Sequence, residues 1–273
     1  MRKKKNITNI ILVLVILTGL TLLLYPTVAN WWNQRHQTRA VASYVEKVAE
    51  MSDKTQENMW NEAAAYNEKL ASQPQSYILS DEETERYNKI LDVTGTGIMG
   101  YVQIPKIHVE LPIYHGTDPA VLQIAIGHIA GSSLPVGGGS SHCVISGHRG
   151  LASARLFTDL DKLDVGDSFK LQVLDRTLTY EVDQVRIVLP DELSDLQIEE
   201  GKDYCTLVTC TPYGVNTHRL LVRGHRIDNK DDSLRVKADA SQINPMYVVP
   251  FILAGMIVVI LIWILILKAF RRR

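Results

Sequence analysis

The sequence has few of the residues that build disulfide scaffolds or metal sites. It contains three cysteines among 273 residues, an odd number that is too small for a disulfide framework. No cysteine lies at the spacing from histidines or other cysteines that zinc sites use. We therefore expect neither a bound metal nor a cofactor.

Basic residues are scarce in the middle of the chain. Residues 26–245 hold all 30 acidic residues but only 21 of the 29 basic residues, because four basic residues lie in each end. Phosphate contacts need clustered lysine and arginine, and an acidic surface does not offer them. We expect no nucleic-acid partner.

Charge is absent from two long apolar runs, residues 7–25 and 246–267. The second run has 22 residues, which as a helix span about 33 Å, enough to cross the hydrocarbon core of a bilayer. Basic residues precede the first run and follow the second, so the positive-inside rule places both ends in the cytoplasm. We expect a multi-pass protein of the cell membrane whose middle part lies outside. The alternative for the first run is a cleaved signal peptide, with residues 27–29 as a weak small-residue site.

The middle of the chain begins with a helical part. Apolar residues at three- and four-residue spacing predict a helix over residues 39–70, which ends before Pro74. Residues 71–98 then form a long polar loop whose apolar group is Tyr77, Ile78 and Leu79. A connection of this length is more often functional than idle.

Short strands separated by glycine, proline and aspartate turns follow, and they favour a closed barrel or a sandwich. Seven strands are expected, over residues 100–104, 111–114, 142–146, 168–174, 177–189, 204–210 and 219–227. The alternation of apolar residues changes phase near Asp183, which predicts a β-bulge. Two short helices are expected, over residues 119–126 and 154–160.

These elements divide the chain into six segments. They are an N-terminal transmembrane segment (1–25), a helical extension with a lid-like loop (26–98), a β domain (99–228), a linker (229–245), a C-terminal transmembrane helix (246–267) and a basic cytoplasmic tail (268–273).

Cys205 and Cys210 lie on one expected strand, five residues apart. Their side chains therefore point to opposite faces about 17 Å apart and cannot bond each other while the strand is extended. A compartment outside the membrane permits disulfides, and a bond between Cys143 and Cys205 stays open.

Cys210 ends the expected strand 204–210, and Arg219 opens the next one. A hairpin with a loop of about eight residues puts the two side by side at its mouth. A guanidinium beside a sulfur favours the thiolate and stabilises a developing oxyanion. The alternative is a buried cysteine that acts as a small apolar residue.

A cysteine nucleophile needs a histidine, and the chain has eight. His148 follows an expected strand and is flanked by Gly147 and Gly150, which let the backbone turn so that a side chain faces a cleft. His142 begins the same strand and is better explained as an ordinary strand-end residue. His218 points away from the face of Arg219. We therefore expect His148 to be the partner of Cys210.

At this point the sequence resembles the sortase family. Thr-Leu-Val-Thr-Cys at residues 206–210 matches the sortase signature TLxTC, Ser-Gly-His-Arg-Gly at 146–150 looks like the histidine segment, and residues 215–224 look like the arginine strand. The three motifs occur in family order between about Gly100 and Ile227. The chain is similar in three further features to the class C sortases, which polymerise pilins. These features are the two apolar runs, the long N-terminal extension and the sequence Cys-Thr-Pro-Tyr-Gly at residues 210–214.

The resemblance implies a fold and an activity. The fold is mainly β, a closed eight-stranded sortase-type barrel over 99–228 with short helices, an N-terminal helical extension and two transmembrane helices. The catalytic residues are Cys210 as nucleophile, His148 as acid and base, and Arg219 as ligand of the oxyanion and substrate.

The implied reaction is that of a membrane-anchored cysteine transpeptidase on the outer face of a Gram-positive membrane. It cleaves an LPXTG-like sorting signal between Thr and Gly through a thioester and joins it to a lysine amine of another pilin subunit. The expected partners are pilins or other surface proteins with such signals, and the lipid bilayer. Alternatives are a sortase that uses peptidoglycan precursor as acceptor, a membrane-tethered cysteine protease, and a binding module that keeps only the barrel.

Residues outside the catalytic set are expected to hold the substrate. Thr209 supports the oxyanion or orients the peptide, or is an ordinary strand threonine. Leu193, Leu196 and Ile198, in the loop after the strand 177–189, hold the Leu-Pro part of the signal, or tuck into the barrel.

The lid departs from the family pattern. Class C sortases usually carry an Asp-Pro-aromatic triplet that plugs the cleft, but in residues 71–98 Asp81 is followed by Glu82 and Glu83. Tyr77, Ile78, Leu79 and Asp81 are the candidates for a lid of different chemistry, or for a lid that does not inhibit.

Overall fold

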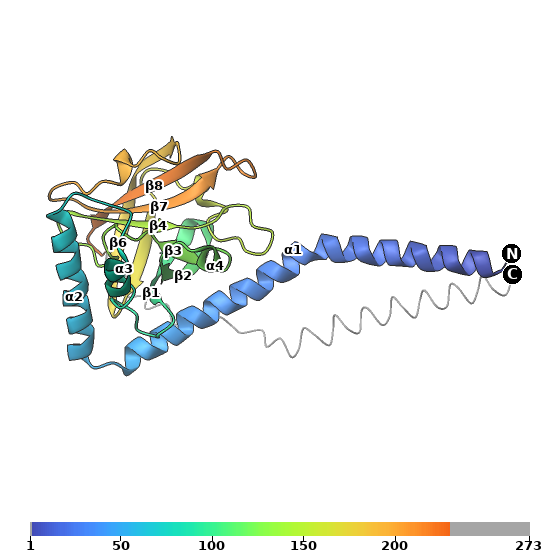
Figure 1. Cartoon of the computed structure of the whole chain (residues 1–273), viewed down its shortest axis with the longest axis horizontal. Helices are drawn as coiled ribbons and strands as arrows, with labels where there is room; N and C mark the ends of the chain where they lie inside the picture. Colours follow the sequence, from blue (N-terminus) through green and yellow to red (C-terminus); the bar gives the residue numbers. More distant parts are fainter. Residues whose placement is uncertain (1, 230–273) are drawn as a thin grey trace. The chain divides into compact units, whose positions relative to one another are not determined.

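The structure is a computed structural model that describes the backbone of residues 2–229 and the side chains of residues 12–229. Figure 1 shows the course of the chain. The expected linker 229–245 (apart from Asn229), the second apolar run 246–267 and the basic tail 268–273 lie outside the described residues. Within the described part, one helix, over Leu12–Glu50, is long and apolar enough to cross a membrane.

The N-terminal part consists of two helices, α1 (Arg2–Glu50) and α2 (Asp53–Ala71). The prediction of a single helix over residues 39–70 is wrong, because α1 ends at Glu50 and α2 begins at Asp53. Ser52 accepts a hydrogen bond from the backbone N–H of Thr55 and caps α2, as serine commonly does at a helix N-terminus. The apolar spacing continues across the break and conceals it.

The C-terminal half of α1 docks on the barrel through polar side chains. The Asn33 amide donates to the Ser153 carbonyl at 2.9 Å, and the Gln37 amide donates to the Ile124 carbonyl at 2.6 Å. The hydroxyl of the buried Tyr44 accepts from the Leu174 N–H at 2.8 Å. This half of α1 is therefore part of the folded domain and not a free stalk.

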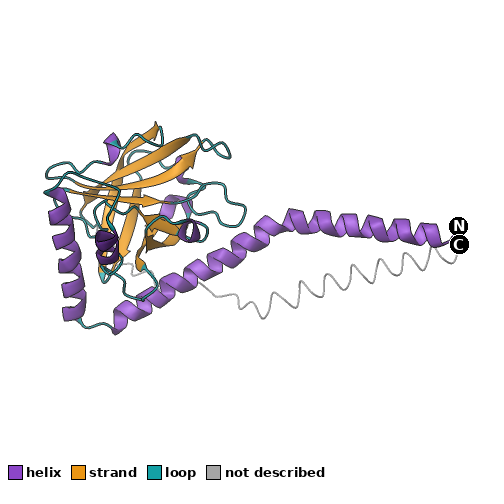
Figure 2. Cartoon of the chain, in the orientation of Figure 1, coloured by secondary structure: helices purple, strands orange, loops and turns teal. Residues whose placement is uncertain are grey.

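Eight strands close into a barrel in the order β1-β2-β3-β4-β7-β8-β6-β5, which confirms the expected closed eight-stranded fold. In Figure 2 the strands form one group, with short helices around them and α2 along one side. The strands are β1 (Ile98–Ile104), β2 (Val109–His115), β3 (Ile126–His128), β4 (Ser141–Ser146), β5 (Ser168–Val173), β6 (Arg176–Val188), β7 (Asp203–Thr211) and β8 (His218–Ile227). The β6–β8 register shifts between Val182 and Gln184, which confirms the predicted bulge.

Three local predictions are wrong. The helix expected over 119–126 is only α4 (Pro119–Leu122), and Ile126 begins β3, a strand too short to show alternation. The helix expected over 154–160 is absent from the described structure; that segment is a buried loop followed by a 3-10 turn, Leu160–Lys162. The loop 71–98 contains a helix, α3 (Asp81–Tyr87), whose N-terminus has a capping box between Ser80 and Glu83.

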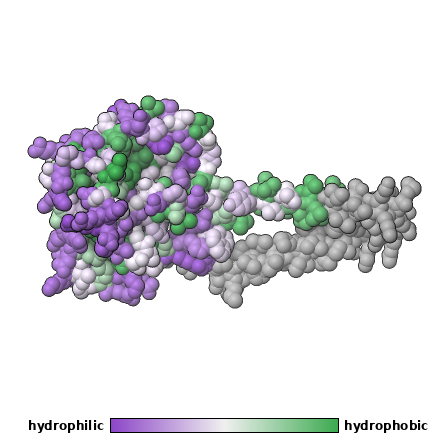
Figure 3. Space-filling model, viewed as in Figure 1, coloured by the Kyte–Doolittle hydropathy of each residue, from purple (hydrophilic) through white to green (hydrophobic). Residues whose placement is uncertain are grey.

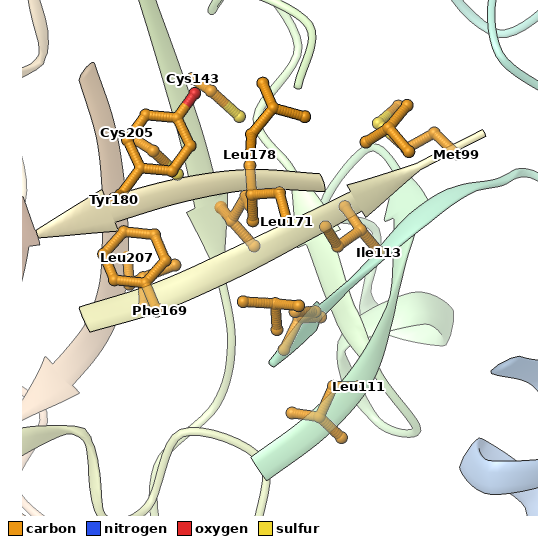
Figure 4. Close-up of a cluster of buried hydrophobic side chains, with 14 of the residues drawn as sticks. Met99, Leu111, Ile113, Cys143, Phe169, Leu171, Leu178, Tyr180, Cys205 and Leu207 are labelled. Carbon is orange, nitrogen blue, oxygen red and sulfur yellow. The ribbon is translucent and has the colours of Figure 1, made fainter. Parts of the chain in front are cut away.

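The barrel interior is filled by apolar side chains from the inward faces of the strands (Figure 4). Cys143 and Cys205 belong to this core and are register partners on the parallel strands β4 and β7. Both are free thiols, so the structure does not contain the disulfide that the sequence left open.

Tyr87 joins α3 to the barrel. Its buried hydroxyl accepts from the Gly116 N–H at 3.0 Å and lies 2.8 Å from His128 Nδ1. Tyr87→Phe leaves these buried groups without their partner, so we expect it to lower the free energy of unfolding by about 1–3 kcal/mol, measured by denaturant titration of the full chain. Tyr66→Phe is the control, because the Tyr66 hydroxyl makes no hydrogen bond among residues 12–229. Equal stabilities of the two variants would contradict the prediction.

Candidate active site

Cys210 and Arg219 are register partners in the hairpin of β7 and β8. Directly opposed residues in an antiparallel pair point to the same face, so the thiol and the guanidinium share one side of the sheet. Cys210 is half-buried, whereas Cys143 and Cys205 are fully buried in the core. Cys210 is therefore the one described cysteine that a substrate can reach.

His148 reaches the same end of the sheet from β4. Ser146 on β4 is the register partner of Val208 on the parallel strand β7, so two residues further on His148 and Cys210 lie at the same level. The Gly147 N–H donates to the Val208 carbonyl at 3.0 Å and continues the pairing beyond the strand. The structure thus brings His148, Cys210 and Arg219 together at one end of β4, β7 and β8.

Glycine is required at position 147 because the backbone there is tightly enclosed. A Cβ atom on Gly147 would lie 2.7 Å from Ile126 Cγ2 and 2.8 Å from Phe157 Cδ2. The Phe157 N–H also donates to the His148 carbonyl at 3.1 Å, so the loop after His148 folds back on itself. The histidine loop is therefore held by packing and by backbone hydrogen bonds on both of its sides.

Burial lowers the pKa of His148 from its usual value of 6.5. The imidazole is therefore mainly neutral at pH 7 and can accept a proton from a thiol. The Arg219 guanidinium donates to the carbonyls of Asn216 and His218, at 3.3 and 3.1 Å, and to no other group between residues 12 and 229. Both bonds use Nη1, so the other donors of its fork are free to bind an oxyanion.

Thr209 lies on the opposite face of β7 from Cys210 and is 1% exposed. Its hydroxyl donates to the Gly147 carbonyl at 2.7 Å. This bond joins the residue before the cysteine to the residue before the histidine. The placement favours a positioning role over direct contact with a peptide, and a substrate-binding role stays a prediction.

Two other histidines have structural partners. His142 is buried, with Nδ1 2.8 Å from the Gln197 carbonyl and Nε2 2.7 Å from the Thr206 hydroxyl, and burial lowers its pKa. His218 lies 2.9 Å from the Thr217 hydroxyl. Neither His142 nor His218 is therefore a better candidate than His148 for the partner of Cys210.

Sequence reasoning missed Arg149. Its guanidinium forms an ion pair with Asp161 and lies 3.5 Å from the Thr211 hydroxyl, one residue beyond Cys210. It therefore bridges the histidine loop and the cysteine strand. No local pattern reveals the contact with Thr211, because the two residues are 62 positions apart in the chain.

A small apolar cluster lies on the face of the sheet that carries Cys210. We call it the outer cluster; its buried members are Val144, Val188, Leu196, Val208 and Leu221, with Tyr77 and Ile129 packed against it. Val208 precedes Cys210 by two residues on β7, and Leu221 follows Arg219 by two residues on β8. Val208 and Leu221 therefore lie on the same face of the sheet as Cys210 and Arg219. In Figure 3, hydrophobic surface gathers where Figure 1 draws β7 and β8.

The loop between β6 and β7, residues 189–202, covers part of this cluster. Leu196 is buried in the outer cluster, Ile198 is half-buried, and Leu193 is 41% exposed. The apolar residues of the loop therefore pack beside the sheet that carries Cys210. Contact with a substrate stays a prediction for all three.

The lid candidates separate in the structure. Tyr77 packs on the outer cluster, Ile78 is 88% exposed, and Leu79 packs against the main core. Asp81 is the exposed first residue of α3. Between residues 12 and 229, no hydrogen bond joins the segment 71–98 to His148, Cys210 or Arg219. The three apolar side chains, Tyr77, Ile78 and Leu79, therefore do not form one unit.

Within residues 12–229, no group of three His, Cys, Asp or Glu side chains is placed to hold a metal ion.

Comparison with known proteins shows the family to which this chain belongs. The family model for the sortase domain matches residues 102–227. Sortase C1 from Streptococcus agalactiae is 54% identical, with a TM-score of 0.69 over 70% of this chain and 100% of that structure. Sortase C from Clostridium perfringens, solved with the C-terminal cell wall sorting motif, is 41% identical, with a TM-score of 0.63 over 70% of this chain and 100% of that structure.

A curated relative matches a shorter part. Sortase D of Bacillus subtilis is 34% identical over 131 residues, which are 47% of this chain. The match spans 63% of the length of that relative. The residues matched by the family model, 102–227, include His148, Cys210 and Arg219.

Proposed function

Because the chain belongs to the sortase family, we propose that it is a class C cysteine transpeptidase that joins pilin subunits through an LPXTG-like sorting signal. The observation that carries this proposal is the pairing of Cys210 with Arg219 on β7 and β8 while His148 is tied to β7 through Gly147. From the strand register, we expect the three groups to share one face beside the outer cluster. A nucleophile, a base and an oxyanion ligand in this relation are what acyl transfer requires.

The first half-reaction forms a thioester. Neutral His148 takes the proton of Cys210, and the sulfur attacks the Thr carbonyl carbon of the signal. Arg219 donates hydrogen bonds to the resulting oxyanion, which stabilises charge that exists only in the transition state and intermediate. The bond between the Thr carbonyl carbon and the Gly nitrogen then breaks, and His148 returns the proton to the leaving amine.

The second half-reaction consumes the thioester. A neutral lysine amine of another pilin attacks the acyl carbon and gives up one proton to His148. The Cys210 sulfur leaves and takes that proton from His148. The product is an amide between two chains. The solved Clostridium perfringens relative, described with a cell wall sorting motif, supports a signal of this class as the substrate.

Product analysis tests the proposal. The full chain is mixed with a pilin that carries the signal and with a peptidoglycan-type amine, and the products are separated under denaturing conditions. A covalent ladder of pilins is expected. Transfer only to a peptidoglycan-type amine would identify the cell-wall alternative, and release of a free Thr carboxylate alone would identify a protease. No thioester on Cys210 with any such signal would overturn the proposal.

Thr209→Val should weaken catalysis without unfolding the barrel. The change keeps the shape of the side chain but removes the 2.7 Å bond to the Gly147 carbonyl that ties the histidine loop to β7. We expect kcat to fall about tenfold, corresponding to about 1.4 kcal/mol, with KM within a factor of two. Thr209→Ser, which keeps the hydroxyl, is the control. Equal kcat for both variants would show that the bond does not position the loop.

We also propose that the barrel lies outside the cell and both ends of the chain lie inside. The apolar part of α1 and the basic residues at both ends support this topology. Protease added to intact protoplasts should therefore degrade residues 30–229 and spare tags fused to either terminus, as detected by immunoblotting. Loss of the C-terminal tag would contradict the second membrane crossing, and loss of the N-terminal tag would contradict the first.

A further inference from the structure

The middle of the β6–β7 loop is held by two side chains that precede α3. The Tyr77 hydroxyl donates to the Leu196 carbonyl at 2.9 Å. The Gln75 Oε1 accepts from the Ile198 N–H at 3.1 Å, and its Nε2 donates to the Tyr77 hydroxyl oxygen at 2.9 Å. The two side chains thus bond to each other and to the backbone on both sides of Gln197.

The barrel holds the residue between them. His142 Nδ1 lies 2.8 Å from the Gln197 carbonyl, which only a protonated nitrogen can approach as a donor. Its Nε2 then accepts from the Thr206 hydroxyl at 2.7 Å on β7. Three consecutive loop residues, 196 to 198, are therefore fixed from two sides.

Packing supports the same attachment. Tyr77 is packed against the outer cluster in which Leu196 is buried. The preceding backbone also presses on Gly131, where a Cβ atom would lie 2.1 Å from the Ser76 carbonyl oxygen. Gly131 has a φ of +86°, so a side chain is disfavoured there both by space and by conformation. The segment 75–77 is thus seated in a site shaped for it.

This attachment differs from a plug. The bonds of Gln75 and Tyr77 go to the β6–β7 loop, and those of Arg219 within residues 12–229 go to its own hairpin. Ile78, the most exposed of the three apolar candidates, covers nothing. Removal of the segment is therefore expected to make the β6–β7 loop mobile without changing the access of reagents to the Cys210 thiol.

We infer that Gln75 and Tyr77 are positioning residues, which hold the β6–β7 loop in the position where it forms a wall of the site for the apolar part of the sorting signal. The inference rests on the proposed function for the identity of the ligand. The position of the loop follows from the geometry alone. Tyr77 anchors Leu196, and Leu196 lies in the outer cluster, whose member Val208 is two residues from Cys210 on β7. Without the anchors, the loop and this wall lose their fixed position.

Point variants of the full chain test the inference. A deletion of residues 73–90 is unsuitable, because it removes Tyr87 and its buried hydrogen bonds. Tyr77→Phe removes only the hydroxyl and keeps the ring on the outer cluster. Gln75→Ala removes the acceptor of the Ile198 N–H. Ile78→Ala is the matched control, since it changes an exposed side chain of the same segment.

Three measurements are made on each variant: KM and kcat with an LPXTG peptide, the alkylation rate of Cys210, and hydrogen exchange of the Ile198 amide. For Gln75→Ala and Tyr77→Phe we expect KM to rise about tenfold and kcat to change less than about twofold, since anchors worth about one hydrogen bond each are lost. Exchange at Ile198 should accelerate about tenfold in Gln75→Ala. Alkylation should stay within about threefold of wild type, and Ile78→Ala should change nothing.

Two results overturn the inference. One is wild-type KM and wild-type exchange in both variants, which would show that the contacts of Gln75 and Tyr77 do not hold the loop in position. The other is an alkylation rate that rises a hundredfold while KM falls, which makes the segment a plug. If wild-type protein cleaves no such peptide, the proposed function fails, and exchange at Ile198 still decides whether Gln75 anchors the loop.

Discussion

Cys210→Ala is expected to abolish the thioester intermediate with an LPXTG peptide and with it all transpeptidation. In the proposed mechanism this sulfur becomes acylated, and no other described cysteine lies near Arg219 and the histidine loop. Loss of a nucleophile leaves only the rate that binding and oxyanion stabilisation supply, so activity should fall by at least about 10⁴-fold. Intact-mass spectrometry of the full chain after incubation with the peptide measures the acyl adduct directly.

Cys143→Ala and Cys205→Ala are the matched controls. Both thiols lie inside the barrel, on the opposite face of the sheet from Cys210, and no substrate reaches them. These variants should form the adduct at a rate close to that of the wild type. An adduct that persists in Cys210→Ala and disappears in Cys205→Ala would show that the site has been assigned to the wrong cysteine.

His148→Ala should lower kcat/KM by about 10²–10⁴-fold, the range for loss of a positioned acid and base. In the proposed mechanism this residue accepts the thiol proton and then returns it to the leaving amine. His218 lies next to Arg219 but points to the opposite face of the hairpin, so it does not replace His148. The barrel should remain folded, because the histidine loop is held by backbone bonds from Gly147 and Phe157 rather than by the imidazole. Initial rates with a fluorogenic signal peptide, together with circular dichroism, separate these effects.

The pH profile gives an independent check of the role of His148. Burial lowers its pKa below 6.5, so the neutral form that accepts the thiol proton persists below that pH. Activity is therefore lost as the pH falls through the lowered pKa, and the acid limb of kcat/KM lies below pH 6.5. Arg219→Ala should lower the rate by about 10²–10³-fold without moving this limb, because a guanidinium does not titrate there. An acid limb that survives in His148→Ala would assign it to another group.

The barrel was predictable because its strands are locally encoded. Alternation and turn residues located seven of the eight strands, and the phase change at Asp183 located the bulge that the register shift confirms. Strand β3 was missed because three residues carry no period. The break between α1 and α2 was missed because apolar spacing runs through it and only the Ser52 cap marks it. The capping box of α3 is a local signal, formed by Ser80 and Glu83.

The candidate site divides in the same way. Cys210 and Arg219 were predictable as neighbours because a hairpin sets their register from the length of its turn. The bonds from Thr209 to Gly147, from Arg149 to Thr211 and from Gln75 to Ile198 were not. Each joins residues that are more than 60 positions apart, and no local period encodes such a contact. The sequence therefore predicts which candidate residues are neighbours, whereas the contacts that hold them in place come from the tertiary structure.

The docking of α1 on the barrel has a consequence for how substrates are found. The first barrel contact on this helix, where the Asn30 side chain accepts from the Arg155 N–H, comes five residues after Tyr25, a rise of about 8 Å. With residues 7–25 in a bilayer, the catalytic end is carried at a set height and diffuses laterally with the lipid. A substrate whose signal is tethered at that height meets it by a search in two dimensions at high effective concentration, and a substrate shed into solution loses that advantage.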